Sequence, residues 1–241
     1  MIKSENKKEE KNKIMIKFDS VSKTYKGDFM ALEEINLNIR EGEFISVVGQ
    51  SGSGKSTLLK LIYAEEAATA GEVYFDGNPL SSISRRKLPF HRREIGTIFQ
   101  DFKLLPKKTT YENIAYALEV SGAPDEEIAE NVPQILDIVG LANKAKKYPY
   151  QLSGGEQQKV AIARALVHTP MVIVADEPTG NLDPIASLEI VKLLIRINEL
   201  GTTVILASHD KDIVDKANKR VLVLERGKII ADYPKGKYKI S

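Results

Sequence analysis

Two segments near the start of the chain alternate between apolar and polar residues, which is the period of a half-buried β-strand. The first is IMIKFDSVSKTY at 14–25, and the second is LEEINLNIR at 32–40. In the second segment Ile35, Leu37 and Ile39 share one face, and polar residues separate them. A sheet with one covered face produces this alternation, so we expect an antiparallel β subdomain here.

Three later segments are short and continuously apolar, and each ends in a polar residue. They are FISVVG at 44–49, MVIVAD at 171–176 and TVILASH at 203–209. Runs of this kind suit parallel strands that are covered on both faces. Helical patterns at 56–64, 126–139, 154–168 and 186–199 lie around them. The pattern predicts an α/β sheet whose strand ends face one ligand-binding crevice.

The middle of the chain has a different character. Helix-like segments dominate from about 101 to 159, which predicts a helical subdomain inserted into the sheet domain. Pro133 lies inside one of these patterns, so we expect a helix to start or kink there. No internal repeat or low-complexity linker divides the chain, and we therefore expect one domain at 14–231, with an arm at 1–13 and a tail at 232–241.

Composition narrows the class of protein. The chain has 241 residues, 42% hydrophobic and 28% charged, as in a soluble globular protein. It has no cysteine, which excludes disulfides and thiolate chemistry. The formal net charge of +2 is far below the strongly basic charge that is typical of nucleic-acid-binding domains. The Lys/Glu-rich arm is expected to be disordered. No apolar run approaches the roughly 18 residues of a membrane span, so any membrane role requires a partner.

The stretch GQSGSGKST fits the phosphate-binding pattern G-x-x-x-x-G-K-[ST]. A strand precedes it and a helix follows, which favours a phosphate cradle over an ordinary glycine-rich turn. Glycines allow successive N–H groups to curl around phosphate oxygens, and the helix adds its dipole. Nucleotide contacts are expected from Gly49, Gln50, Ser51, Gly52, Ser53, Gly54, Lys55, Ser56 and Thr57.

The stretch MVIVADEP delivers Asp176 and Glu177 to a strand end. Many strands end in acidic residues that have no function. Beside a phosphate-binding loop, however, these two residues are expected to take part in catalysis. Asp176 can hold Mg²⁺ through water, and Glu177 can orient or deprotonate the attacking water.

The stretch QLSGGEQQKVAIARAL begins with a capping box of Ser153 and Glu156. Gly154 and Gly155 lower helix propensity in its first turn, and a purely structural cap would not need them. Glycines there can expose N–H groups to a closely approaching anion. A second phosphate site is understandable if this helix tip reaches the nucleotide of another copy.

LSGGEQQ resembles the signature of ATP-binding cassette (ABC) ATPases, and the other motifs follow that family's order from about 16 to 231. The resemblance implies a P-loop NTPase fold with a mixed central sheet. It also implies a head-to-tail dimer with two ATP and Mg²⁺ between P-loop and signature. Residues expected to contact the other copy's ATP are Ser153, Gly154, Gly155, Glu156 and Asp183, the last from GNLD.

The same resemblance assigns further roles. Tyr25 in SKTYKG looks like the adenine-stacking aromatic, although plain packing would also explain it. His209 in LASHD resembles the histidine that contacts the γ-phosphate, and strand-end histidines are otherwise often only satisfied polar residues. Gln100 in TIFQDF looks like the glutamine that contacts Mg²⁺ and senses the membrane partner.

The resemblance therefore implies a catalytic set and a metal set. The catalytic set is Glu177, His209 and Lys55, and the metal set is Ser56, Gln100 and Asp176. The preference for ATP over GTP rests on the family likeness, because stacking tolerates either base. His91 and His168 have no such context and are expected to be structural.

Within the family, ADEPTGNLD is similar to the branch whose members serve lipoprotein release, macrolide export and cell division. Within that branch, residues 88–124 are most similar to the cell-division ATPases. This implies an ATPase at the cytoplasmic face of the membrane, held there by an integral membrane subunit. Ala64 and Ala68 depart from the usual pattern, outside the catalytic motifs. Export, a soluble role on ribosomes or DNA, and a nucleotide-gated module with little turnover remain alternatives.

Overall fold

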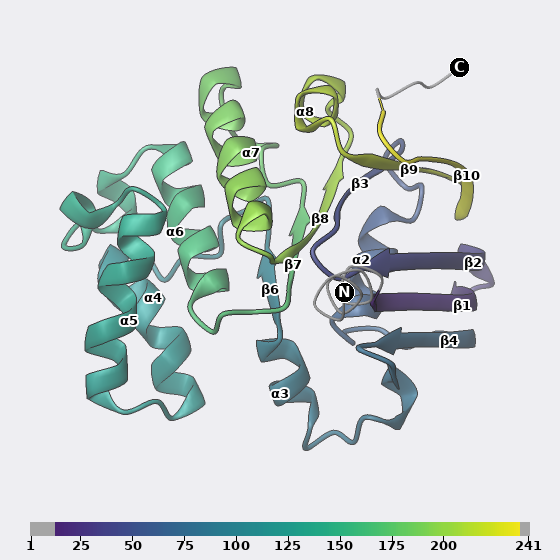
Figure 1. The fold of residues 1–241 in the computed structure, drawn as a ribbon, viewed down its shortest axis with the longest axis horizontal. Helices are drawn as coiled ribbons and strands as arrows, with labels where there is room; N and C mark the ends of the chain where they lie inside the picture. Colours follow the sequence, from purple (N-terminus) through teal and green to yellow (C-terminus); the bar gives the residue numbers. More distant parts are fainter. Residues whose placement is uncertain (1–12, 237–241) are drawn as a thin grey trace, which may run out of the picture.

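The computed structural model describes residues 13–236, which form two β-sheets flanked by helices (Figure 1). Most of the expected arm (1–12) and the end of the tail (237–241) lie outside the described residues. In Figure 1 the smaller sheet lies at the right, helices α4, α5 and α6 lie at the left, and the larger sheet runs between them.

The smaller sheet is antiparallel, with the strand order β2-β1-β4-β5. Its strands are β1 (Ile14–Tyr25), β2 (Phe29–Arg40), β4 (Ala70–Phe75) and β5 (Asn78–Pro79). In β2 the predicted alternation is confirmed, because Ile35, Leu37 and Ile39 are buried and the residues between them are exposed. This sheet packs on α2 (Lys55–Ile62) through its apolar face.

The larger sheet is mixed, with the strand order β10-β9-β3-β8-β7-β6. Its strands are β3 (Phe44–Val48), β6 (Ile95–Ile98), β7 (Val172–Asp176), β8 (Thr203–Ser208), β9 (Arg220–Glu225) and β10 (Lys228–Tyr233). All neighbours pair in parallel except β9 and β10. Every residue of β3 and β8 is buried, as expected of strands that are covered on both faces.

The remaining helices surround the larger sheet. They are α3 (Leu88–Arg93), α4 (Thr110–Ser121), α5 (Asp125–Ile138), α6 (Gly154–Leu166), α7 (Pro184–Glu199) and α8 (Lys211–Ala217). Single 3₁₀ turns occur at Leu80–Ser82, Ala142–Lys144 and Pro149–Gln151. A continuous apolar core joins α4, α5, α6 and α7 to one face of the sheet. Of the helices that the structure describes, none is both long and apolar enough to cross a lipid bilayer.

We expected a helix to start or kink at Pro133, and no helix starts there, because α5 begins at Asp125 and continues through Pro133. Ile128 and Val132 before the proline, and Ile135 and Leu136 after it, are all buried against neighbouring helices. Packing on both sides of the proline outweighs the hydrogen bond that its missing N–H removes.

His91 and His168 occupy structural positions, as expected. His91 is buried, its Nε2 lies 3.0 Å from the carbonyl oxygen of Ile62, and its ring meets the edge of Phe75. Burial lowers the pKa of both histidines below the ordinary value of 6.5. In the folded protein they therefore remain neutral at a pH where the unfolded chain already binds protons on them.

Acidification from pH 7.5 to 5.5 should therefore lower the free energy of unfolding. Each histidine adds a slope of at most about 1.4 kcal/mol per pH unit below its unfolded pKa, and none above it. His91→Gln should make the slope shallower, which urea unfolding at several pH values measures. Equal slopes for variant and wild type would contradict this account.

Candidate functional site

The ends of three parallel strands meet at one edge of the larger sheet. Strand β8 pairs with β3 on one side and β7 on the other, so that Ser208 lies beside Val48 and Ala207 beside Asp176. The segments that follow these strands open onto one cavity of about 620 Å³. Its lining is Phe29, Ala31, Gly49, Gln50, Ser51, Gly52, Gly54, Lys55, Ser56, Thr57, Gln100, Glu177 and His209.

The loop between β3 and α2 is shaped by its glycines. Gly54 has φ +107°, and a Cβ there would lie 2.6 Å from the carbonyl oxygen of Ala31. No side chain caps α2, and its first turn holds no acidic residue. By contrast, capping boxes close the starts of α4 and α6. The first N–H groups of α2 are therefore left for an anion in the cavity.

Lys55 is buried and points back into this loop. Its Nζ donates to the carbonyl oxygens of Gly49 at 2.7 Å and Gln50 at 3.1 Å. The same Nζ lies 4.0 Å from Oε1 of Glu177. A buried ammonium needs such partners, and here it is held within the cradle that surrounds the cavity.

Glu177 connects the lysine to the histidine. Its Oε1 lies 2.8 Å from Nδ1 of His209, and the backbone N–H of His209 reaches Oε2 at 3.4 Å. Glu177 itself adopts φ +48°, a left-handed conformation that is costly for a residue with a side chain. Its N–H donates to the carbonyl oxygen of Ala207, which fixes this turn against β8. The turn aims the carboxylate at the cavity instead of continuing the strand.

Asp176 lies next to the cavity beside Ser56. Burial raises the pKa of its carboxyl group, and a hydrogen bond with the Ser56 side chain partly offsets that rise. Its Oδ1 is buried and has no hydrogen-bond partner among residues 13–236. A carboxylate oxygen without a partner next to a serine hydroxyl is a donor set that fits Mg²⁺.

Gln100, which follows β6, also lines the cavity. Its Nε2 donates to Oδ1 of Asn181 at 3.3 Å, and Nδ2 of Asn181 donates to the carbonyl oxygen of Gln100 at 3.0 Å. Gly180 leaves room for this contact, because a Cβ there would lie 2.7 Å from Nε2 of Gln100. Asn181 is thus a positioning residue that the sequence motifs did not single out.

Tyr25 is not in the lining of the cavity, but its cross-strand neighbour Phe29 is. The two residues pair directly at the end of the β1–β2 hairpin, so their rings lie on the same face of the sheet. Phe29 is 59% exposed, and Nζ of Lys23 lies 5.0 Å from the centre of the Tyr25 ring. Sequence reasoning missed Phe29, although its spacing from Tyr25 across the turn Lys26–Asp28 was the available signal.

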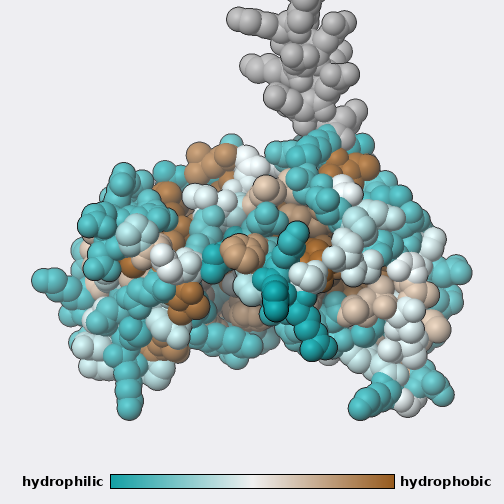
Figure 2. Space-filling model, turned by 90° about the horizontal axis from the view of Figure 1, so that it is seen from below, coloured by the Kyte–Doolittle hydropathy of each residue, from teal (hydrophilic) through white to brown (hydrophobic). Residues whose placement is uncertain are grey.

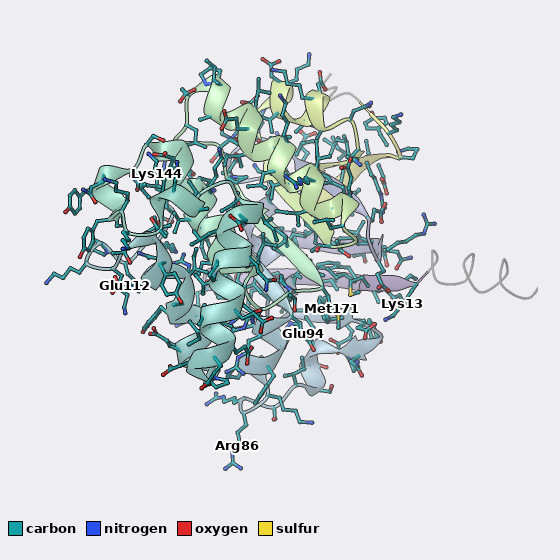
Figure 3. All side chains as sticks on the ribbon, turned by 60° about the vertical axis from the view of Figure 1, so that its left-hand side comes forward. Lys13, Arg86, Glu94, Glu112, Lys144 and Met171 are labelled. Atoms are coloured by element: carbon teal, nitrogen blue, oxygen red, sulfur yellow. The ribbon has the colours of Figure 1, made fainter. Side chains whose placement is uncertain are left out.

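The signature residues form a second group, outside the lining of this cavity. The Ser153 hydroxyl accepts from the Glu156 N–H, and Glu156 accepts from the Ser153 N–H, which completes the predicted capping box. The N–H of Ser153, and Lys144, whose Nζ lies 3.0 Å from Oε1 of Glu156 and which is labelled in Figure 3, lower the pKa of Glu156. Asp183 caps α7 by accepting from Ile185 and Ala186.

The two signature glycines also have a packing role. A Cβ on Gly154 would lie 3.2 Å from Leu182, and one on Gly155 would lie 3.0 Å from Cβ of Ala186. The starts of α6 and α7 can approach closely because both residues lack side chains. The expectation concerned the cap alone, and the close packing of the two helix starts gives these glycines a second role beside the expected anion contact.

Comparison with known proteins agrees with this geometry. A family model described as "ABC transporter" matches residues 32–180. The "Cell division ATP-binding protein FtsE" of Bacillus subtilis (strain 168) is 50% identical over 224 residues, which are 93% of this chain and 98% of that protein. The protein with the same description from Mycobacterium tuberculosis is 49% identical over 226 residues, again 93% of this chain and 98% of that protein.

Solved structures extend the likeness to the fold. The protein cbiO1 from Clostridium perfringens, part of the ABC transporter complex cbiONQ, superposes with a TM-score of 0.86 at 34% identity, covering 92% of this chain and 89% of that one. The ATP-binding cassette MJ0796, dimeric and bound to ADP and Pi after hydrolysis, gives 0.82 at 39% identity, covering 93% and 100%. This chain therefore belongs to the ABC transporter family and is an ATPase of the ABC type.

Proposed function

We propose that this chain is the ATPase subunit of a membrane-bound ABC complex and that it performs the cell-division role of the FtsE proteins. In this role, cycles of ATP binding and hydrolysis control cell-wall hydrolases through the membrane subunit FtsX. The observation that carries the proposal is the convergence of Lys55, Glu177 and His209 on one cavity beside an uncapped helix start. This chain is 46–50% identical to FtsE proteins over nearly their whole length, which supports its assignment to the cell-division branch of the family.

The residues of the cavity divide the chemistry among them. The glycine loop binds phosphate oxygens with its N–H groups, and Lys55 exchanges its two carbonyl partners for the β- and γ-phosphates. Glu177 accepts the proton of the attacking water as general base. His209, which bonds to Glu177 here, contacts the γ-phosphate and holds the carboxylate in place.

Mg²⁺ is the metal that the donor set fits. Ser56, Asp176 and Gln100 would hold it, and Asp176 offers the carboxylate oxygen that has no hydrogen-bond partner among the described residues. The chemistry that the ion would supply there is neutralisation of charge on the phosphate oxygens.

Two copies complete each site. In this chain the start of α6, with its Ser153–Glu156 capping box, contributes nothing to the lining of its own cavity. We infer that Ser153, Gly154, Gly155 and Glu156, with Asp183, contact the ATP held by the twin's loop. The MJ0796 cassette, 39% identical to this chain, is a dimer bound to ADP and Pi, which supports a dimer here.

The membrane enters only through the partner subunit, at the cytoplasmic face, and nucleic acid has no part in the cycle. An exporter of lipoproteins, macrolides or peptides would use the same cavity with a different membrane subunit. Identification of the integral membrane protein that copurifies with this chain decides between FtsX and an export permease.

Glu177→Gln should retain ATP binding and lower turnover by a factor on the order of 100 or more, because general-base catalysis contributes at least that much. ATP should then hold the two copies together, which light scattering detects as a doubled mass. Near-normal phosphate release from this variant would refute the role of Glu177.

A mixture of two inactive chains should regain one complete site. Ser153→Arg blocks the signature contact, and Lys55→Ala removes the phosphate contact. A heterodimer of the two combines one intact loop with one intact signature. ATP should therefore drive association in the mixture but in neither sample alone. Equal behaviour of all three samples would show that sites are not shared between copies.

We infer that Phe29, which lines the cavity and pairs with Tyr25, stacks on the base beside the expected Tyr25. Phe29→Ala should then weaken ATP binding about fivefold or more, since a ring stacked on a base contributes at least roughly 1 kcal/mol. Binding of tripolyphosphate, which lacks a base, should stay unchanged in isothermal titration. Met30→Ala is the matched control, because Met30 is exposed on the other side of the strand and is not in the cavity lining. A loss of tripolyphosphate binding would instead indicate a damaged loop.

A further inference from the structure

Lys144 forms an ion pair at the start of α6, although none of the sequence motifs includes it. It ends the 3₁₀ turn Ala142–Lys144, and its Nζ lies 3.0 Å from Oε1 of Glu156. The N–H of Tyr111, in the first turn of α4, donates to the carbonyl oxygen of Ala145 at 2.9 Å. This bond holds the end of the turn, on which Figure 3 labels Lys144. The lysine is therefore brought to the start of α6 by a turn that is itself tied to another helix.

The protein partly encloses this ion pair. Hydrophilic side chains project freely from the face of the molecule in Figure 2, and water screens charges in such positions. By contrast, only 34% of the Lys144 side chain and 25% of the Glu156 side chain are exposed. The two charges therefore act on each other, and on any ion that approaches the helix start, with less screening by solvent.

The capping box uses part of the hydrogen-bonding capacity of the helix start. Oε2 of Glu156 accepts from the N–H of Ser153 at 2.9 Å, and the N–H of Glu156 donates to the Ser153 hydroxyl at 3.3 Å. Among residues 13–236, the N–H groups of Gly154 and Gly155 have no acceptor, as is usual for the first residues of a helix. Two donors are thus left for an anion, directly beside a carboxylate.

That carboxylate opposes the binding of an anion. Because Oε2 of Glu156 lies 2.9 Å from the nitrogen of Ser153, its negative charge is located at the helix start itself. The N–H of Ser153 and the ammonium group of Lys144 lower the pKa of Glu156, so the carboxylate is ionised at neutral pH. An unpaired carboxylate there would repel the phosphates of the twin's ATP and offset the attraction of the helix dipole.

We infer that Lys144 is a positioning residue of the shared ATP site, where it neutralises Glu156 so that the start of α6 can receive the twin's polyphosphate. The inference rests on the proposed function, because it depends on the contact between this helix start and the ATP of another copy. Lys144 acts through Glu156 and needs no contact of its own with the nucleotide.

Neighbouring lysines do not supply this charge. Lys159, in the second turn of α6, pairs with Glu189 on α7 at 2.7 Å. Lys146 is exposed, and its ammonium group has no ion-pair partner among the residues that the structure describes. Lys144 is therefore the cation that compensates Glu156, and Lys146 offers a matched control.

The test measures the ATP-driven dimerisation of Glu177→Gln chains by analytical ultracentrifugation. Lys144→Gln should weaken this dimer about fivefold or more, because it leaves the Glu156 carboxylate without its cation beside the phosphates. Lys144→Met, which keeps the length of the side chain without its charge, should show the same loss. Lys146→Gln removes an equal charge two residues away and should dimerise like the parent chain.

A second substitution separates the charge of Lys144 from a structural role. Addition of Glu156→Gln to Lys144→Gln removes the unpaired carboxylate, and glutamine can still complete the capping box. The double variant should therefore dimerise at least about threefold more tightly than Lys144→Gln alone. If Lys144 only held the turn against α6, the second substitution would restore nothing.

The outcomes distinguish this inference from the proposed function. If the parent Glu177→Gln chains bind ATP but do not dimerise, the shared site fails, and the role of Lys144 fails with it. If the parent chains dimerise and Lys144→Gln dimerises equally well, the shared site stands and the role of Lys144 is wrong. A loss in Lys144→Gln that Glu156→Gln does not reverse would also overturn the inference.

Discussion

The site depends on one constraint, which is the double pairing of β8. Because β8 pairs in parallel with both β3 and β7, the ends of all three strands are fixed at one level. The phosphate loop, the two acidic residues and the histidine each follow one of these ends. No loop has to reach far to build the cavity, and its precision comes from buried strands with little freedom to shift.

The polar side chains of the cavity form a chain. Lys55 is held by two carbonyl oxygens and Glu177, and Glu177 is held in turn by His209. Exposure rises along this chain, from 7% for the lysine side chain and 17% for the glutamate to 66% for the histidine. The lysine is thus fixed deep in the cradle, whereas the histidine lies at the open edge where a partner copy can approach. This gradient suits a site that is assembled in two stages, with nucleotide first and the twin second.

Much of this could be predicted from the sequence because local patterns determined it. The period of two in β2, the continuous apolar runs and the glycine loop each depend on neighbouring residues only. The spacing of Phe29 from Tyr25 across the turn was a usable signal for their pairing, but only tertiary structure shows that Phe29, and not Tyr25, lines the cavity. The contact of Asn181 with Gln100 joins residues 81 positions apart, and no local rule predicts it.

At Pro133 and at the signature glycines, local sequence preference gave an incomplete or incorrect prediction. Local propensity favours a break at the proline, but buried neighbours on both sides keep α5 continuous. Local reasoning also assigned Gly154 and Gly155 to an anion alone, although both also lie in close contact with the start of α7 or the segment just before it. In each case the deciding contact comes from a different helix, so tertiary packing outweighs the local preference.

In the proposed dimer, the glycine loop of one copy meets the start of α6 of another copy when ATP is bound. The chain has no cysteine, so single cysteines can carry spin labels without background. One copy would be labelled at Lys26 beside the cavity and the other at Asn143 near α6, both exposed. Addition of ATP to Glu177→Gln chains should produce one short, narrow distance between the labels by pulsed electron resonance. No such distance, with ATP bound in both copies, would contradict the claim.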